Sequence, residues 1–492
     1  MAVKLQRPIL VGGIGLSLLL WLLDSVQNSV AEFGGTTMLG IMAASLGVWL
    51  LKRPKSSPLQ KPTIIPSPTK EAAEKEIALL TTTIDKLVLE VEGINKSEKV
   101  SNDISQLRQK VKTITQELER EELSIVITGN QGVGKTAFTE ILKSEWISKN
   151  SQKIEVTDIT WESEWITKNQ DAQINPLSPY DLILFVTTGD LIDSEFQALL
   201  KLTSFGQRFI LIWNKQDLYL PEQKPQVFQK IKETLSTINS EENLVGISAK
   251  PNYIKVRKYQ QDGSLQEYLE KPLAEISGLT EKLNQILEKE KAKLVWATTR
   301  RKAEIVRLEA KNILNQIRKE RAIPVIEQYQ WIAAATAFAN PVPALDLLAT
   351  AAINAQLIVD LSAIYEQKIS LEKGKQVAGT MAELMLKLGL VELSTKTLTI
   401  ILKSNSVTFV AGGAIQAVSV AYLTRVAGIS LVEYFATQTD SNSMNIDKLG
   451  KIIQTVFSKT QENNFLKSFV TQAMSHVLPQ DKNLEVVSTT VE

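Results

Sequence analysis

The sequence has no cysteine and only one histidine, His476, in 492 residues. The lack of cysteine excludes disulfides, thiolate metal sites and a cysteine nucleophile. One histidine excludes a metal site built from several histidines and disfavours a Ser-His-Asp triad. Net charge is also low, because 55 Lys and Arg residues nearly balance 54 Asp and Glu residues. We therefore expect no specific nucleic-acid partner. The length predicts two or three folded units.

Two apolar runs without a charged residue stand near the N-terminus, over residues 8–23 and 35–51. Each is close to the roughly 17–25 residues that span a bilayer. Lys4 and Arg7 precede the first run and three further basic residues follow the second, which places both ends in the cytoplasm. We therefore expect a transmembrane hairpin over residues 1–52, in a plasma, inner or thylakoid-type membrane. A signal peptide and a pair of buried core helices are the alternatives.

A proline-rich linker, residues 53–70, leads into two helical patterns over residues 71–121. In both patterns apolar residues recur every three or four positions, and Gly93 separates the two. The apolar positions are Ile77, Leu80, Ile84, Leu87, Val91 and Ile94, then Val100, Ile104, Leu107, Val111, Ile114 and Leu118. The spacing predicts an antiparallel helical hairpin. Self-association of two chains through the same positions is the alternative.

A glycine-rich segment follows the strand-like run 124–128 and precedes a helix-like segment, 137–149, that has neither glycine nor proline. Its residues are Gly129, Asn130, Gln131, Gly132, Val133, Gly134, Lys135 and Thr136, which satisfy the pattern G-x-x-x-x-G-K-[ST]. Glycine lets the backbone turn tightly with its N–H groups pointing inward, where they cradle phosphate oxygens at a helix N-terminus. Lys135 then reaches the β- and γ-phosphates, and the Thr136 hydroxyl ligates Mg²⁺. The segment predicts a nucleoside triphosphate site.

Two later motifs indicate the base. They are Asn214, Lys215, Gln216 and Asp217 after one buried-strand pattern, and Ser248, Ala249 and Lys250 after another. The Asp217 carboxylate can accept hydrogen bonds from the N1–H and the exocyclic amine of guanine, a pair of donors that adenine lacks. Lys215 can lay its stem over the purine while Asn214 braces the loop. The Ala249 N–H can read the guanine carbonyl and Lys250 can cover the base, so we expect GTP and GDP as ligands.

The order and setting of these motifs resemble a P-loop GTPase of the TrmE–Era–septin class, over about residues 122–290. The resemblance implies GTP hydrolysis with Mg²⁺. Members of the class carry Asp-x-x-Gly at the end of a strand, where the aspartate holds a Mg²⁺ water and the glycine N–H senses the γ-phosphate. Asp158 takes the aspartate position, but Trp161 stands in the place of the glycine, and tryptophan is bulkier and stiffer.

The path from Thr136 to Asp158 is short, with only 21 residues between them. A helix and one strand use most of these residues, so there is no room for a long first switch or for an additional edge strand. Glu162 is the only candidate in the sequence for positioning the attacking water, unless a partner supplies a residue. We therefore expect secure binding and slow hydrolysis without assistance.

The string of elements predicts an α/β fold. Strands near residues 124–128, 153–158, 181–186, 208–213 and 243–247 alternate with helical segments, which is typical of a mostly parallel, doubly wound sheet. Asp193 and Glu195 follow the third strand, where acidic residues favour a helix start. Gln261-Asp262-Gly263 lies between two strand-like runs and predicts an exposed β-hairpin.

The last third of the chain is helical in pattern. Residues 279–323 contain no glycine or proline and predict a long connecting helix, with 291–324 lying outside the α/β domain. Its basic residues, which include Arg300, Arg301, Lys302, Arg318, Lys319 and Arg321, form either a solvated face or an arm against anionic lipid.

An apolar helical domain is expected over residues 325–440, followed by amphipathic helices over 441–480 and a tail, 481–492. Its two most apolar segments, 331–365 and 407–435, are interrupted by proline or by polar and charged residues, which are costly in hydrocarbon. This composition favours a compact all-α bundle apposed to a membrane over true spans. The region resembles the helical domain of obscure role that follows the GTPase in YcjF-type and cyanobacterial Era-like proteins.

The whole sequence therefore predicts a membrane-anchored GTPase switch, whose nucleotide state biases the contacts of its flanking helices and of a protein partner or a second copy. A dynamin-like protein that remodels bilayers is one alternative, and a nucleotide-stabilised scaffold without turnover is another.

Overall fold

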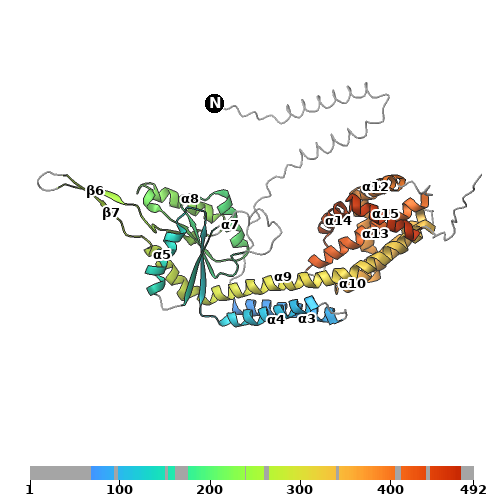
Figure 1. Ribbon diagram of the computed structural model, residues 1–492, viewed down its shortest axis with the longest axis horizontal. Helices are drawn as coiled ribbons and strands as arrows, with labels where there is room; N and C mark the ends of the chain where they lie inside the picture. Colours follow the sequence, from blue (N-terminus) through green and yellow to red (C-terminus); the bar gives the residue numbers. More distant parts are fainter. Residues whose placement is uncertain are drawn as a thin grey trace, which may run out of the picture.

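The computed structural model describes residues 68–92, 98–149, 153–160, 176–238, 240–259, 265–339, 343–404, 412–438 and 444–477. The predicted transmembrane hairpin lies outside the described residues, as do Trp161, Glu162 and nearly all of the proline-rich linker. The described residues form an α/β body and an all-helical body, which one long helix joins (Figure 1). Two further helices lie along that long helix between the bodies (Figure 1).

Five parallel strands form the central sheet of the α/β body, in the order β2-β1-β3-β4-β5. The strands are β1 (Leu123–Gly129), β2 (Ile154–Thr160), β3 (Leu182–Thr187), β4 (Phe209–Trp213) and β5 (Leu244–Gly246). β2 forms one edge, and its Asp158 lies opposite Ile127 of β1. The predicted parallel sheet is confirmed, and in the described part of the chain no further strand pairs with β2.

Helices cover both faces of this sheet because successive strand residues point to opposite faces. The helices are α5 (Lys135–Glu145), α7 (Asp193–Ser204), α8 (Lys224–Ser236) and the first turns of α9 (Ser277–Ala339). Ile125 and Ile127 belong to the core cluster under α5 and α9, whereas Val126 belongs to the cluster under α7 and α8. The sheet is therefore doubly wound, as predicted.

A two-stranded antiparallel hairpin, β6 (Ile254–Tyr259) and β7 (Leu265–Glu270), extends away from the α/β body (Figure 1). All six residues of β7 are exposed. The hairpin occupies the place that Gln261-Asp262-Gly263 indicates, although these three residues are not among the described ones.

Helix α9 has 63 residues and is the longest element of the described chain, about 95 Å at 1.5 Å per residue. Pro324 lies inside it, so the expected end of the helix at residue 324 was wrong. A proline removes one backbone hydrogen bond and normally ends or kinks a helix. Here Ala322 and Ile326, on either side of the proline, are buried in the core of the helical body, and this packing continues the helix.

Helices α3 (Lys70–Glu92) and α4 (Glu98–Gln116) pack on the middle of α9, and their apolar positions form one core cluster with Ala303, Val306 and Ala310. Ion pairs fix the directions, with α3 parallel and α4 antiparallel to α9. The pairs are Glu76–Arg307 and Glu90–Arg318 from α3, then Lys110–Glu309 and Glu117–Lys302 from α4. The predicted antiparallel hairpin is confirmed, and the described apolar positions of α3 and α4 pack within one chain.

The ion pairs also account for much of the basic character of α9. Arg318 is buried and pairs with Glu90 and Glu366, and Lys302 pairs with Glu117. Arg301 is buried against the α/β body. These three residues contact other parts of the protein, so they do not form a basic arm that lies against lipid.

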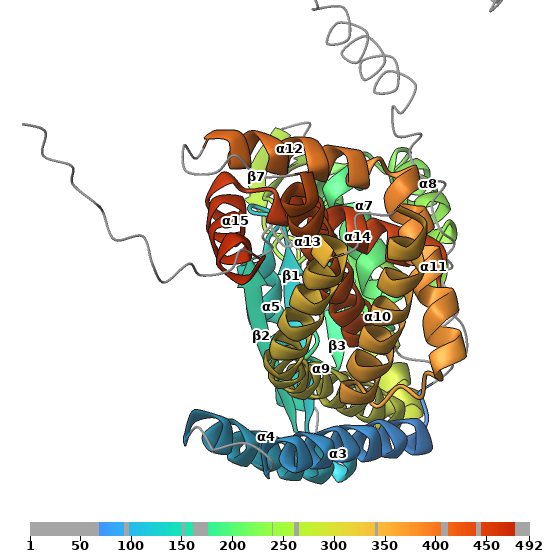
Figure 2. The ribbon, with the colours of Figure 1, turned by 90° about the vertical axis from the view of Figure 1, so that its right-hand side faces the viewer.

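The helical body contains the end of α9 and six further helices among the described residues (Figure 2). They are α10 (Pro343–Ile364), α11 (Leu371–Lys387), α12 (Leu390–Ser404), α13 (Gly412–Thr437), α14 (Ile446–Thr460) and α15 (Asn463–Val477). All seven contribute to one hydrophobic core, so the amphipathic helices near the C-terminus belong to the same bundle as the apolar ones.

Helix α13 is central to this bundle and lies against α9 (Figure 2). Within the described residues, its stretch Ile415–Thr437 is the one segment with the length and composition of a membrane span. Of its most apolar window, 61% is buried inside the bundle. Arg425, in the middle of the stretch, donates to Glu327 and Gln330 on α9. The described contacts are those of a packed core helix.

Candidate nucleotide-binding site

The predicted site residues that the structure describes, which exclude Glu162, meet at the carboxyl ends of the parallel strands, where ligands bind in open α/β sheets. The glycine-rich loop connects β1 to α5, the motif that begins at Asn214 follows β4, and the motif that begins at Ser248 follows β5. Three segments far apart in the sequence are thereby brought to one edge of the sheet.

The glycine-rich loop has the backbone that its sequence requires. Gly129, Gly132 and Gly134 have φ angles of 148°, 81° and 90°, which residues other than glycine rarely adopt. A Cβ at Gly134 would also lie 2.6 Å from the Asn214 amide nitrogen. The loop therefore turns tightly into the first turn of α5, and such a turn at a helix N-terminus is suited to an anion. Val133 is buried under the loop, while Gln131 is exposed.

Lys135 lies inside the loop. Its ammonium group donates to the carbonyl oxygens of Gly129 and Asn130, at 2.9 and 2.8 Å. Partial burial lowers the pKa of Lys135, and the negative charge of Asp158 opposes that shift. The charge of Lys135 is thus held at the centre of the loop, where a phosphate chain would bring more acceptors than the two carbonyl groups provide.

Thr136 and Asp158 supply the oxygen atoms that a divalent cation would need. Thr136 is exposed in the first turn of α5, and Asp158 is exposed near the end of the edge strand β2. Mg²⁺ in such sites uses one or two protein ligands together with phosphate oxygens and water. The described residues contain no group of three or more His, Asp or Glu side chains that could hold a metal alone, so a cation at Thr136 and Asp158 would need further oxygen ligands from a nucleotide and from water.

Asn214 joins the three motifs through its buried side chain. Its Nδ2 donates to the carbonyl oxygen of Val133 in the loop at 2.9 Å, and its Oδ1 accepts from the Ala249 N–H at 3.1 Å. Lys215, with the left-handed φ of 63°, donates to the Gly132 carbonyl oxygen at 2.8 Å. The loop that would hold phosphate and the two motifs that would hold the base are therefore one hydrogen-bonded unit.

The remaining motif residues differ in exposure. Asp217 is half-buried, and its Oδ2 accepts from the Asn252 N–H at 3.1 Å, which fixes the carboxylate. Ser248 is buried and its backbone bonds with Glu275, whereas Lys250 is exposed. Because the Ala249 N–H already donates to Asn214, reading a base carbonyl would require this N–H to be shared between two acceptors.

Glu195 is a site residue that the sequence did not single out. It lies in the first turn of α7, which begins at Asp193 as expected, and its Oε2 accepts from the Ile192 N–H at 3.2 Å. It is also buried, and its Oε1 accepts from the Asn130 side chain in the glycine-rich loop at 2.7 Å. Burial raises the pKa of Glu195, while these hydrogen bonds oppose the shift. The only available signal was an acidic residue a few positions after a buried strand, which does not distinguish a helix start from a contact with the loop.

Two protein families match separate parts of the chain. The model of the KAP family P-loop domain matches residues 100–296, and that of a domain of unknown function, DUF697, matches residues 300–462. The chain therefore contains a P-loop NTPase domain followed by a large helical region. The boundary between the two matches falls inside α9, close to where the helix leaves the sheet and meets α3 and α4. No curated protein matches the sequence.

Solved structures also match the chain, at low similarity. Two chains from work titled as an oligomerised bacterial dynamin pair that senses and tethers membranes each cover 83% of this chain and 74% of their own. Both are 10% identical, with TM-scores of 0.22 and 0.24.

Proposed function

We propose that this chain is a membrane-anchored GTPase of the TrmE–Era–septin class, in which the P-loop NTPase domain binds GTP and GDP with Mg²⁺. The observation that carries the proposal is the hydrogen-bonded unit around Asn214. It ties the phosphate-binding loop to a fixed carboxylate, Asp217, and to the segment 248–250. A carboxylate in that position complements the paired N–H donors of guanine, and adenine would leave it without donors.

In this proposal each residue has a defined task. The loop N–H groups and Lys135 bind the phosphates, and Lys135 exchanges its two carbonyl acceptors for phosphate oxygens. Thr136 ligates Mg²⁺, and Asp158 holds one of its waters. Lys215 and Lys250 lie over the base, whose edge faces Asp217. Mg²⁺ neutralises charge that develops on the phosphates during hydrolysis.

Hydrolysis is expected to be slow unless it is assisted. Among the described residues around the loop, Glu195 is the buried carboxylate, and both of its oxygens are already engaged by Asn130 and Ile192. Glu162, the candidate for orienting water, lies outside the described residues. A partner that supplies the missing group would raise the rate, as in other phosphoryl transfer systems.

The test is nucleotide binding by the full chain, measured by isothermal titration calorimetry with GTP, GDP and ATP. We expect GTP and GDP to bind and ATP to bind at least about a hundredfold more weakly. Lys135→Ala should abolish binding, and Asp217→Asn should shift preference from guanosine to xanthosine nucleotides, because an amide presents a donor where the carboxylate accepts. Equal affinity for ATP, or GTP affinity unaffected by both changes, would refute the assignment.

A dynamin-like activity is the second candidate. It is favoured by the stalk of α3, α4 and α9, which separates the α/β body from the helical body. Nucleotide-dependent polymerisation on liposomes distinguishes it from a simple switch, which should bind GTP without assembling. A scaffold without turnover would show no product in a single-turnover GTP assay, even at high protein concentration.

A further inference from the structure

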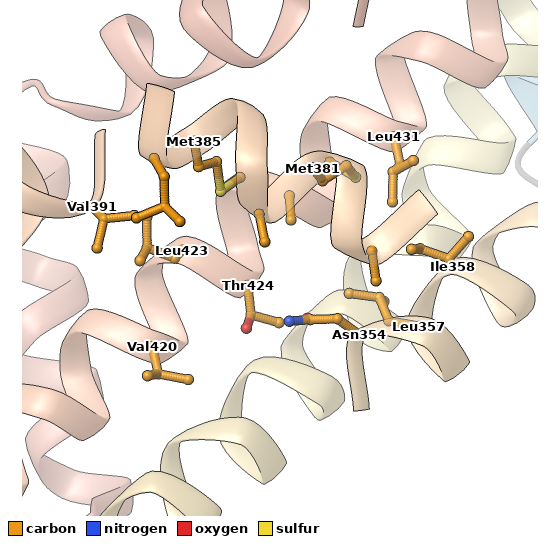
Figure 3. Close-up of a pocket in the computed structure, with 14 residues that line it drawn as sticks. Asn354, Leu357, Ile358, Met381, Met385, Val391, Val420, Leu423, Thr424 and Leu431 are labelled. Carbon is orange, nitrogen blue, oxygen red and sulfur yellow. The ribbon is translucent and has the colours of Figure 1, made fainter. Parts of the chain in front are cut away.

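Two surfaces of the described structure are not covered by other described residues. One is an apolar trough between α10, α11, α12 and α13, which is open to solvent and which Met385, Val391 and Leu423 help to line (Figure 3). Its lining residues carry no charge that would select an occupant. The other is the β6–β7 hairpin, whose strands are charged, and these charges specify a partner.

The β6–β7 hairpin is incomplete as a folded unit. Among the described strands β6 pairs only with β7, and all six side chains of β7 are exposed. They include large apolar side chains, since Tyr268 is 44% exposed and Leu269 is 69% exposed. A two-stranded hairpin alone is marginally stable in water and normally needs a third strand or a covering helix. We therefore expect another element to pack on this hairpin.

The central sheet has an open edge that could supply the missing strand. Within the described chain, its edge strand β2 pairs with β1 alone. β2 has seven residues and contains neither proline nor glycine. The outer side of such a strand presents backbone N–H and C=O groups that can pair with an added strand.

The hairpin does not reach this edge in its own chain. It follows β5, which forms the edge of the sheet opposite to β2. Two backbone hydrogen bonds of 3.0 Å between Ser248 and Glu275 fix the base of the hairpin beside β5. From there the hairpin extends away from the α/β body (Figure 1). A contact between the hairpin and β2 therefore joins two different chains.

Charge determines which strand of the hairpin fits β2. The charged residues of β2 are two exposed acids, Glu155 and Asp158. Those of β6 are all basic, namely Lys255, Arg257 and Lys258, whereas those of β7 are acidic. Opposite charges on neighbouring strands are stabilising, and like charges that face each other are not. β6 therefore complements β2, whereas two copies of β2, or two copies of β6, would bring like charges together.

The ion pairs within the hairpin favour the same partner. Glu267 of β7 already pairs with Lys255 and Arg257. Lys258 of β6 and Glu155 of β2 have no ion pair among the described residues. A second hairpin would thus offer β6 an acid that is already paired, and the two hairpins together would still lack covering helices. β2 offers an unpaired acid and a sheet that has helices on both faces.

We propose that β6 of one copy adds to the β2 edge of a second copy, so that the hairpin extends the five-stranded sheet of its neighbour. The hairpin gains a third strand and the open edge is covered. Because the two surfaces differ, the contact is head-to-tail, and it repeats into an open row unless its rotation closes a ring.

The experiment uses the fact that the chain has no cysteine. Full chains that carry Glu155→Cys or Lys258→Cys are mixed in detergent without nucleotide, so the result does not depend on the proposed GTPase activity. A bismaleimide that spans about 8 Å, roughly the distance between diagonal neighbours on adjacent strands, is then added. We expect cross-linked dimers that contain one chain of each kind. In the control mixture Lys232→Cys, at an exposed position of α8, replaces Lys258→Cys and should give few dimers.

Two results of this cross-linking would overturn the proposal. The first is a yield from the Glu155→Cys and Lys258→Cys mixture that does not exceed the yield of the control mixture. The second is equal cross-linking of Lys258→Cys with Glu270→Cys, an exposed position of β7, because two hairpins would then pair with each other.

Charge reversal tests the selectivity of the contact. Glu155→Lys and Lys258→Glu should each weaken self-association of the full chain about threefold or more, measured by analytical ultracentrifugation. An equal mixture of the two variants should recover it, because every β6 then meets a β2 of opposite charge. Mixing would not correct a structural defect, and thermal unfolding verifies that both variants are folded. Folded variants whose mixture associates no better than either alone would overturn the proposed pairing.

Discussion

At the scale of single residues, the amide groups of Asn214 and Asn130 determine how the glycine-rich loop is held. Asn214 uses both ends of its amide, one toward Val133 and the other toward Ala249. Asn130 ties the opposite side of the loop to the buried carboxylate of Glu195. Both contacts are hydrogen bonds between protein groups, so they pre-organise the loop and binding loses less conformational freedom.

Replacing Asn214 with alanine should damage both stability and binding. The change leaves the Val133 carbonyl and the Ala249 N–H without partners in a buried place, which should lower the free energy of unfolding by about 2–4 kcal/mol. Chemical denaturation measures this loss, and a guanine-nucleotide titration should show affinity falling at the same time. Asn252→Ala keeps the backbone N–H that fixes Asp217 and serves as the control. An Asn214→Ala protein as stable as the wild type would contradict the bridging role.

Replacing Asn130 with alanine tests the contact that the sequence did not reveal. The buried Oε1 of Glu195 would lose its donor, so we expect unfolding to become easier by about 1–3 kcal/mol. Nucleotide affinity should fall several-fold because the loop is held on one side only. Gln131→Ala changes an exposed neighbour in the same loop and should have little effect in either assay. Equal effects of the two changes would argue against an anchoring role for Glu195.

At the scale of elements, the sequence predicted the sheet well because buried parallel strands are nearly continuous apolar runs. Residues 124–128 and 208–213 could be recognised as strands for this reason. The packing of α3 and α4 on α9 could not be recognised, because the contact residues Ala303 and Ala310 have small side chains and lie within a strongly charged segment. Pro324 indicated a helix end that tertiary packing overrides. In the site, the motif residues could be recognised from their spacing. The role of Glu195 could not, because it depends on a hydrogen bond from Asn130, which is distant in the sequence.

The packing of α13 on α9 can be tested at glycine positions. A Cβ on Gly428 would lie 2.7 Å from Ile326 Cγ1, so Gly428→Ala forces the two helices apart. We expect a net loss of about 1–2 kcal/mol after the gain in helix propensity is included. Gly379 in α11 has nothing within 4 Å of its Cβ position, so Gly379→Ala should instead gain up to about 1 kcal/mol. Thermal unfolding of both variants should move in opposite directions, and a stabilised Gly428→Ala would refute close packing here.

At the scale of the whole molecule, charged side chains fasten the parts together along α9. Arg301 donates to the carbonyl oxygens of Gly206 and Tyr180 in the α/β body, and burial lowers its pKa to about 10, so it remains charged at neutral pH. Farther along, Arg318 bonds with Glu90 of α3 and with Glu366, which follows α10. The α/β body, the helical hairpin and the helical body are thereby all attached to one helix.

The Glu366 carboxylate makes this attachment sensitive to acid. A hydrogen bond from Lys86 and the charge of Arg318 lower the pKa of Glu366 relative to its usual value. Because the pKa of Glu366 is lower in the folded than in the unfolded protein, its carboxylate stabilises the folded protein fully above the unfolded pKa, about 4.5. This stabilisation is lost as the pH falls through the folded pKa. Because half of the side chain is exposed, the effect should be modest. Below pH 4.5 the protection of α3 against hydrogen exchange, taken relative to the intrinsic rate at each pH, should fall more in the wild type than in Glu366→Gln, and identical protection profiles would contradict this role.

The continuity of α9 also governs how the protein can be divided. Leu283 and Leu287 belong to the core of the sheet, Val306 and Leu314 to that of the hairpin, and Ile326 and Ala334 to that of the helical body. A protease cut or a shortened gene that ends anywhere from residue 283 to residue 334 therefore removes core side chains from at least one unit. Neither half should be expected to fold as well alone as within the intact chain, and evolution can exchange one half only by keeping the helix that both halves share.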